Sequence, residues 1–95
     1  MLDVFDESRA WAMDPRVALR AESFGALAYH FGTRRLSFLK HPMLVAVVEQ
    51  LGQHPSASAA CDAVGVPAAR RAQIHAALGT LADTGMIVHR EGEAA

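Results

Sequence analysis

The residues of this sequence that could do chemistry are five histidines and one cysteine. The histidines are scattered along the chain, at His30, His41, His54, His75 and His89. They form neither an HxxxH pair nor an HExxH motif, and the single Cys61 excludes an internal disulfide and a site with several thiolates. The sequence also lacks a GxSxG motif, a phosphate-binding glycine loop and paired carboxylates. We therefore expect no catalysis, no metal and no cofactor, and we interpret the chain as a binding protein.

Four of the nine positive charges of the chain lie in two arginine pairs, Arg34-Arg35 and Arg70-Arg71. Residues 1–22 hold five acids against three arginines, whereas residues 23–90 hold three acids against six bases. With a formal net charge of −1, the chain has too little positive charge to hold a nucleic-acid duplex by phosphate neutralisation alone. The mildly basic body can still orient a short acidic ligand.

Length and composition indicate one folded domain. Ninety-five residues, 52% of them hydrophobic, suffice for a single modest core. The N-terminus has no apolar signal segment, and no apolar run is long enough to span a bilayer. We expect a reduced, soluble, cytoplasmic protein with an acidic N-terminal arm (residues 1–15), a folded domain (residues 16–89) and a flexible tail (residues 90–95).

Alternating apolar residues predict a half-buried strand over residues 16–22 and a β-hairpin over residues 25–40. The hairpin sequence is GALAYHFGTRRLSFLK, in which Gly32-Thr33 fits the two-residue loop of a type II′ turn. A tight turn of this kind also fixes which residues of the two strands face each other.

The predicted register places Leu27 opposite Phe38 and Tyr29 opposite Leu36. These four apolar side chains would then share one face of the sheet, and small or polar side chains the other. We expect the four to belong mainly to the core.

After the hairpin, the apolar spacing changes from the period of a strand to that of a helix. The expected helices cover residues 42–52, 56–63 and 67–83, and a last extended piece covers residues 86–89. Pro42 and Pro67 suit helix starts, Ser56 suits an N-cap, and Gly65 suits a helix end. The prediction is an α+β, winged-helix-like fold: a three-stranded antiparallel sheet followed by a three-helix bundle.

The third strand, Arg35 to Leu39, would lie at an edge of this sheet. Unpaired N–H and C=O groups at a sheet edge can bind an extended peptide as an added strand. The third helix would form the opposite wall, with Arg71, His75 and Leu78 at i, i+4 and i+7 beside its buried stripe. Residue types leave a second interpretation open, in which the arginine pairs only protect the edge from aggregation or solvate the helix.

A long stretch of this sequence resembles a known family. The resemblance is most specific in YHFGTRRLSFL, residues 29–39, and it extends to DPRVALR, residues 14–20, and to residues 42–48. It covers most of the chain, from about residue 11 to residue 89. The sequence resembles the MftB family, the peptide chaperones of mycofactocin biosynthesis. This family belongs to the PqqD-like recognition elements for ribosomally made, post-translationally modified peptides.

The resemblance implies a non-catalytic adaptor. Such an adaptor binds the leader of a short precursor peptide and presents it to a radical S-adenosylmethionine enzyme, which modifies the C-terminal Val-Tyr of the precursor. In PqqD-like domains the leader lies as an added strand between the third strand and the third helix. Carried over to this sequence, the peptide-binding residues are Arg35, Leu36, Ser37, Phe38, Leu39, Arg71, Ile74, His75 and Leu78. The iron–sulfur cluster and S-adenosylmethionine would belong to the partner enzyme, because one cysteine cannot hold a cluster.

Two other functions remain open from the residues alone. The last two helices resemble a helix-turn-helix with Arg70-Arg71 at the start of the third helix, as in a winged-helix DNA-binding regulator. The chain lacks the basic footprint of such proteins, so we expect neither nucleic acid nor membrane as a partner. A structural subunit that uses its edge strand to dimerise is the third possibility.

Overall fold

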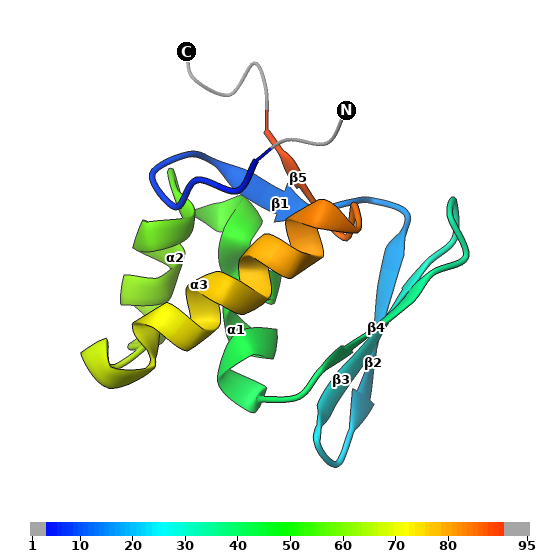
Figure 1. Ribbon diagram of the computed structural model, residues 1–95, viewed down its shortest axis with the longest axis horizontal. Coiled ribbons are helices and arrows are strands. Elements are labelled where there is room, and N and C mark those ends of the chain that lie inside the picture. Colours follow the sequence, from blue (N-terminus) through cyan, green and yellow to red (C-terminus); the bar gives the residue numbers. More distant parts are fainter. Residues whose placement is uncertain (1–3, 91–95) are drawn as a thin grey trace.

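The computed structural model describes residues 4–90 and has helices packed against one side of a small sheet (Figure 1). In chain order the elements are β1 (Trp11–Met13), β2 (Val17–Glu22), β3 (Gly25–His30), β4 (Leu36–Leu39), α1 (Pro42–Gln50), the 3-10 helix η1 (Leu51–Gln53), α2 (Ala57–Val64), α3 (Ala68–Asp83) and β5 (Ile87–His89). Strands β2, β3 and β4 form an antiparallel sheet in that order, and the three α-helices follow it. This is the predicted α+β, winged-helix-like architecture.

A second, two-stranded sheet joins the two ends of the described chain. β1 pairs antiparallel with β5, with Trp11 opposite His89 and Met13 opposite Ile87. The side chain of Trp11 is buried, and the ring of Phe5 lies 5.2 Å from its ring. Part of the segment interpreted as an arm is therefore built into the fold. The strand β1 was not predicted, because three residues are too few to establish a strand period.

Of the expected tail, residues 91–95 lie outside the described residues, as do residues 1–3 of the expected arm. Arg90 is described and is bonded to the fold. Its N–H donates to the carbonyl of Ala10 (3.0 Å), and its guanidinium donates to the carbonyls of Gly52 (3.0 Å) and His54. Arg90 thus links the end of β5 to the turn that follows α1.

The helix boundaries follow from local capping and agree with the prediction. The hydroxyl of Ser56 accepts a hydrogen bond from a main-chain N–H in the first turn of α2 (3.0 Å), and Gly65 ends that helix with a φ of 86°. Pro42 is the first residue of α1, where its missing N–H costs nothing. His41 caps the start of this helix, which was not predicted: its Nδ1 accepts a hydrogen bond from the N–H of Met43 (3.1 Å). Within residues 4–90, no helix is long and apolar enough to cross a membrane.

The hairpin of β3 and β4 has the predicted register but not the predicted turn. Leu27 lies opposite Phe38, as expected. The loop has four residues instead of two, because the carbonyl of His30 accepts from the N–H of Arg34 (2.7 Å), and Arg34 has a φ of 64°. Gly32 lacks the positive φ that a type II′ turn requires. The register is the same because the predicted two-residue loop and the observed four-residue loop are both centred between Gly32 and Thr33.

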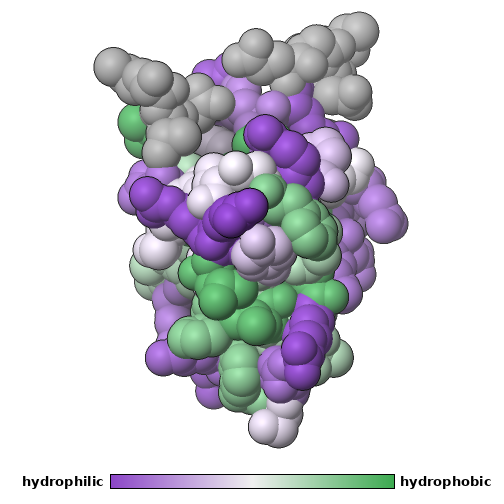
Figure 2. All heavy atoms as spheres, turned by 90° about the vertical axis from the view of Figure 1, so that its right-hand side faces the viewer, coloured by the Kyte–Doolittle hydropathy of each residue, from purple (hydrophilic) through white to green (hydrophobic). Residues whose placement is uncertain are grey.

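The predicted core face of the hairpin was wrong. Ala26, Ala28 and Leu39 are at most 2% exposed, whereas Leu36 is 56% and Phe38 60% exposed. Figure 2 looks onto the side of the molecule formed by this sheet, where a hydrophobic patch lies between polar regions. The prediction equated large apolar side chains with the core. The small alanines of β3 instead face the helices and allow them to approach closely, so the larger side chains face outward.

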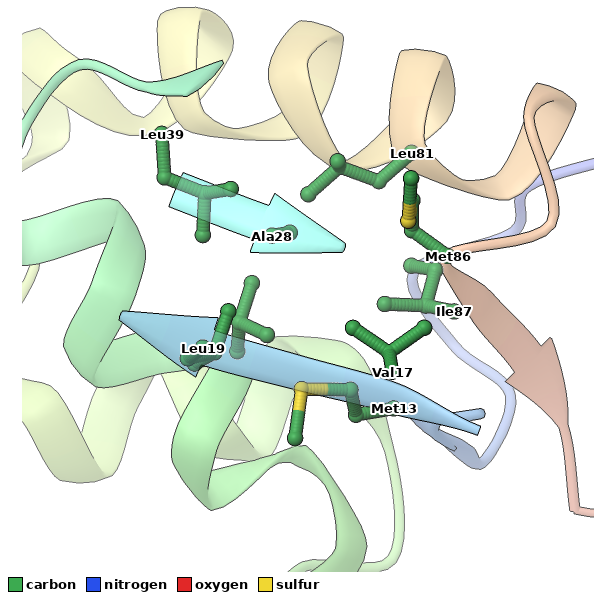
Figure 3. A pocket seen from close by; sticks show the side chains of 9 residues that line it. Met13, Val17, Leu19, Ala28, Leu39, Leu81, Met86 and Ile87 are labelled. Atoms are coloured by element: carbon green, nitrogen blue, oxygen red, sulfur yellow. The ribbon is translucent and has the colours of Figure 1, made fainter. Parts of the chain in front are cut away.

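The inner face of the sheet is filled by the core. Figure 3 shows side chains of the sheet facing those at the end of α3 and in β5, and the labelled residues are Met13, Val17, Leu19, Ala28, Leu39, Leu81, Met86 and Ile87. The side chains between the inner face of the sheet and the end of α3 leave no room for a water molecule. In the described part of the chain, a ligand can therefore reach the sheet at its edges and its outer face.

Candidate functional site

The outer edge of β4 carries main-chain groups that have no partner strand in the described part of the chain. β4 is the last strand of the β2-β3-β4 sheet. The N–H of His30 donates to the carbonyl of Arg35 (3.0 Å), and hydrogen-bonded pairs alternate along an antiparallel ladder. Ser37 is therefore bonded to β3, whereas the N–H and C=O groups of Leu36 and Phe38 point away from it. These outward groups are where an extended peptide could add.

A groove lies between this edge and helix α3. It has a volume of about 210 Å³ and is lined by Phe38, Lys40, His41, Leu44, Arg70, Gln73, Ile74 and Ala77. Leu44, Ile74 and Ala77 make its floor apolar, while Lys40 and Arg70 make it basic. No acidic side chain is among those that line it. The groove therefore complements a peptide with apolar and acidic side chains.

The residues predicted to bind peptide on β4 differ in the direction of their side chains. Leu36 and Phe38 present both their outward main-chain groups and their exposed side chains. Leu39 is fully buried in the core, and Ser37 is half-buried on the same inner face. Arg35 is exposed where the loop enters β4. The strand thus offers a ligand its edge and its outer face.

The predicted helix residues lie mostly on the other side of α3. Arg71 is paired with Asp62 of α2, and Nε2 of His75 lies 2.9 Å from Oε1 of Glu7. Leu78 is fully buried. The structure does not bring these three side chains to the groove, because Arg71 and His75 lie on the flank of α3 that faces α2 and the N-terminal segment, and Leu78 lies in the core.

Ile74 is the one predicted helix residue that lines the groove, and Arg70, Gln73 and Ala77 accompany it. Their spacing of i, i+3, i+4 and i+7 is that of a helix face, so a signal for them exists in the sequence. This spacing could not identify the groove residues from the sequence. The buried stripe of a helix has a flank on each side, and helical spacing does not determine which of the two flanks faces β4. That choice depends on the rotation of α3 about its axis in the folded protein.

A partly buried cluster of Asp14, Arg16 and His30 holds the hairpin loop next to the open edge. Asp14 and His30 are buried, whereas the side chain of Arg16 is largely exposed. The carboxylate of Asp14 accepts two hydrogen bonds from the side chain of Arg16 (3.1 Å each) and one from its N–H (2.8 Å). The side-chain hydrogen bonds lower the pKa of Asp14, although burial acts in the opposite direction. His30 lies with Nε2 3.6 Å from this carboxylate, and its Nδ1 accepts from the N–H groups of Gly32 (3.0 Å) and Thr33 (3.1 Å). The cluster thereby connects the turn that precedes β2 to the tip of the hairpin.

The remaining reactive residue types serve packing. Cys61 is fully buried, and burial raises the pKa of its thiol, which keeps it protonated and unreactive. Within residues 4–90, no group of three or more His, Cys, Asp or Glu side chains could hold a metal ion. What the arrangement offers is a recognition surface.

The fold and the site define a small, winged-helix-like binding domain, in which an open strand edge faces a basic groove with an apolar floor. The model of the peptide chaperone MftB family matches residues 10–88. The chain belongs to this family, whose members are peptide chaperones and not enzymes.

Curated relatives support this assignment over most of the chain. The chain is 47% identical over 89 residues to "Peptide chaperone MftB" of Mycobacterium ulcerans (strain Agy99), covering 94% of this chain and 82% of the relative. It is 46% identical over 87 residues to the protein of the same name from Mycobacterium tuberculosis (strain ATCC 25618 / H37Rv), covering 92% and 80%. The corresponding values for Mycolicibacterium smegmatis (strain ATCC 700084 / mc(2)155) are 48% over 84 residues, 88% and 82%. No solved structure gives a significant match.

Proposed function

We propose that this chain binds the leader of a short, ribosomally made precursor peptide as a strand added to β4. It then delivers the precursor to a radical S-adenosylmethionine enzyme of mycofactocin biosynthesis. Membership of a peptide chaperone family supports a peptide as the partner. The observation that carries strand addition is the outward direction of the N–H and C=O groups of Leu36 and Phe38, at an edge beside a groove.

In this proposal the leader runs along the predicted strand residues Arg35, Leu36, Ser37, Phe38 and Leu39. Leu36 and Phe38 exchange main-chain hydrogen bonds with it, and Arg35 meets an acidic side chain of the leader. Ser37 and Leu39 hold the strand on β3.

The opposite wall of the groove is the flank of α3 that contains Arg70, Gln73, Ile74 and Ala77. The predicted residues Arg71, His75 and Leu78 act indirectly in this proposal. They hold α3 in place through Asp62, Glu7 and the core.

The chemistry of maturation belongs to the partner enzyme. The iron–sulfur cluster and S-adenosylmethionine lie in that enzyme, since Cys61 is the only cysteine here and one thiolate cannot hold a cluster. This chain contributes recognition of the peptide.

The alternative of a DNA-binding regulator has lost support. Of the two arginines at the start of α3, Arg71 is engaged with Asp62. Arg70 alone provides little phosphate neutralisation.

Calorimetric titration with the synthetic leader peptide tests the proposed function. We expect saturable binding of the leader, and loss of precursor maturation when this chain is omitted from a reaction with the enzyme. Titration with duplex DNA over a range of salt concentrations is the control. DNA binding with a steep salt dependence, together with no leader binding, would reverse the assignment.

A further inference from the structure

A second hollow lies beside the first, on the outer face of the sheet. It is lined by Phe24, Phe38 and Lys40 and has a volume of about 410 Å³. Phe24, in the turn between β2 and β3, packs edge-on against Phe38 with the ring centroids 5.9 Å apart. Both rings stay substantially exposed, at 39% and 60%. Exposed aromatic rings that form a hollow are typical of a binding surface.

The two hollows meet at the open edge of β4. Phe38 and Lys40 line both of them. The first hollow, the groove, is completed by α3 and α1, whereas the second is completed by Phe24. They therefore lie on the two faces of any strand that is added at this edge.

Strand geometry links the two hollows to one ligand. Successive side chains of a strand point to opposite faces of a sheet. The residues of an added strand that lie opposite Leu36 and Phe38 must place their side chains on the outer face, within about 5.5 Å Cβ to Cβ. Their neighbours in the sequence must enter the groove beside Ile74.

We propose that the Phe24–Phe38 hollow is a second side-chain subsite for the bound peptide, which takes an aromatic or branched aliphatic residue. This inference rests on the proposed strand addition and specifies its substrate. A strand that is covered on both faces carries a continuous apolar run instead of an alternating pattern. The recognised segment is therefore a short apolar run, with an acidic side chain close to Lys40.

The test is calorimetric titration of Phe24→Ala with the synthetic leader peptide and with its single alanine variants. We expect the substitution to weaken leader binding by roughly threefold to tenfold, the range for losing one aromatic contact. We also expect its effect to be non-additive with alanine at one apolar position of the leader. Phe24→Leu should keep most of the affinity, and thermal unfolding of each variant checks the fold.

Phe31→Ala is the matched control. Phe31 is 64% exposed and packs against Tyr29, but it lines neither hollow. We expect leader affinity to stay within about twofold of the wild type in this variant, since exposed positions outside a site contribute little.

The outcomes separate this inference from the function on which it rests. Unchanged leader affinity in folded Phe24→Ala, with full binding by the wild type, would overturn the subsite and leave strand addition in place. If Phe24→Ala weakened only the association with the maturase, the hollow would be a contact for the enzyme and the subsite would again be wrong. If the wild type does not bind the leader, both the subsite and the proposed strand addition are wrong.

Discussion

Phe38 lies opposite Leu27 in a pair that shares no main-chain hydrogen bonds, so its N–H and C=O point to the open edge of the sheet. Replacing Phe38 by proline removes that N–H, whereas Phe38→Ala keeps it. We expect both variants to bind the leader more weakly than the wild type, because the ring lines both hollows. We expect the proline variant to bind the leader about threefold to tenfold more weakly than the alanine variant, which corresponds to the contribution of one hydrogen bond. Calorimetric titration measures the difference, and equal affinities would contradict strand addition at this residue.

Ser37→Pro serves as the contrast, because the N–H of Ser37 belongs to the ladder with β3. It should lower the free energy of unfolding, since proline inside a paired strand removes a ladder hydrogen bond. Chemical denaturation measures this. A fully stable Ser37→Pro together with a destabilised Phe38→Pro would show that the alternation along β4 is reversed.

Two neighbouring arginines allow a charge test within one helix. Arg70 lines the groove, whereas Arg71 is paired with Asp62 on the other flank. We expect Arg70→Glu to weaken binding of an acidic leader by about 1–2 kcal/mol, an effect that falls as salt rises. Arg71→Glu should change the affinity little. Titrations at two salt concentrations compare the variants, and a larger loss in Arg71→Glu would place the peptide on the other flank of α3.

The Asp14 cluster predicts a dependence of stability on pH. Hydrogen bonds from the Arg16 side chain hold the pKa of Asp14 in the folded protein below the ordinary aspartate value of 3.8. Its stabilising effect is therefore complete above that pH and is lost as the pH falls through the folded value. Asp14→Asn should lower the free energy of unfolding at neutral pH by about 1–3 kcal/mol, because its hydrogen bonds to Arg16 weaken. Urea denaturation from neutral to acid pH should show a smaller loss of stability in the variant. An equal loss in both proteins would mean that other carboxylates control the acid transition.

A close approach of the backbone makes Gly25 intolerant of substitution. Its φ is 148°, and a Cβ there would lie 2.1 Å from the carbonyl oxygen of Leu39. We expect Gly25→Ala to destabilise the fold by 2 kcal/mol or more, on the order of the strain of such a backbone plus the clash. Gly79→Ala is the control, because a Cβ there meets only Phe5 at 4.0 Å and a helix favours alanine. Thermal denaturation of the two variants should move in opposite directions, and a stable Gly25→Ala would contradict the hairpin geometry.

Local chemistry made much of the fold predictable. Proline, serine and glycine at positions 42, 56 and 65 marked the helix boundaries correctly. The register of the hairpin was also right, although the loop uses Arg34 with positive φ instead of Gly32. A two-residue loop and a four-residue loop that are centred on the same position pair the same residues of the two strands. The predicted turn type was therefore wrong although the predicted register was right.

Properties that depend on packing were not predictable in this way. The hairpin has two apolar faces, and the one with small residues, including Ala26 and Ala28, became the core. The orientation of α3 likewise selected Arg70 for the groove and turned Arg71 toward α2. Both choices are made when helices dock on the sheet, and neither the period nor the composition of a single element determines them.

The most direct test of strand addition is amide hydrogen exchange of β4, measured by NMR with and without the leader peptide. Bound leader should slow exchange of the Leu36 and Phe38 N–H groups by roughly tenfold or more, because each then donates to the added strand. The Ser37 N–H, already bonded to β3, should change much less. Unchanged exchange at Leu36 and Phe38, at leader concentrations where calorimetry shows saturation, would contradict binding at this edge.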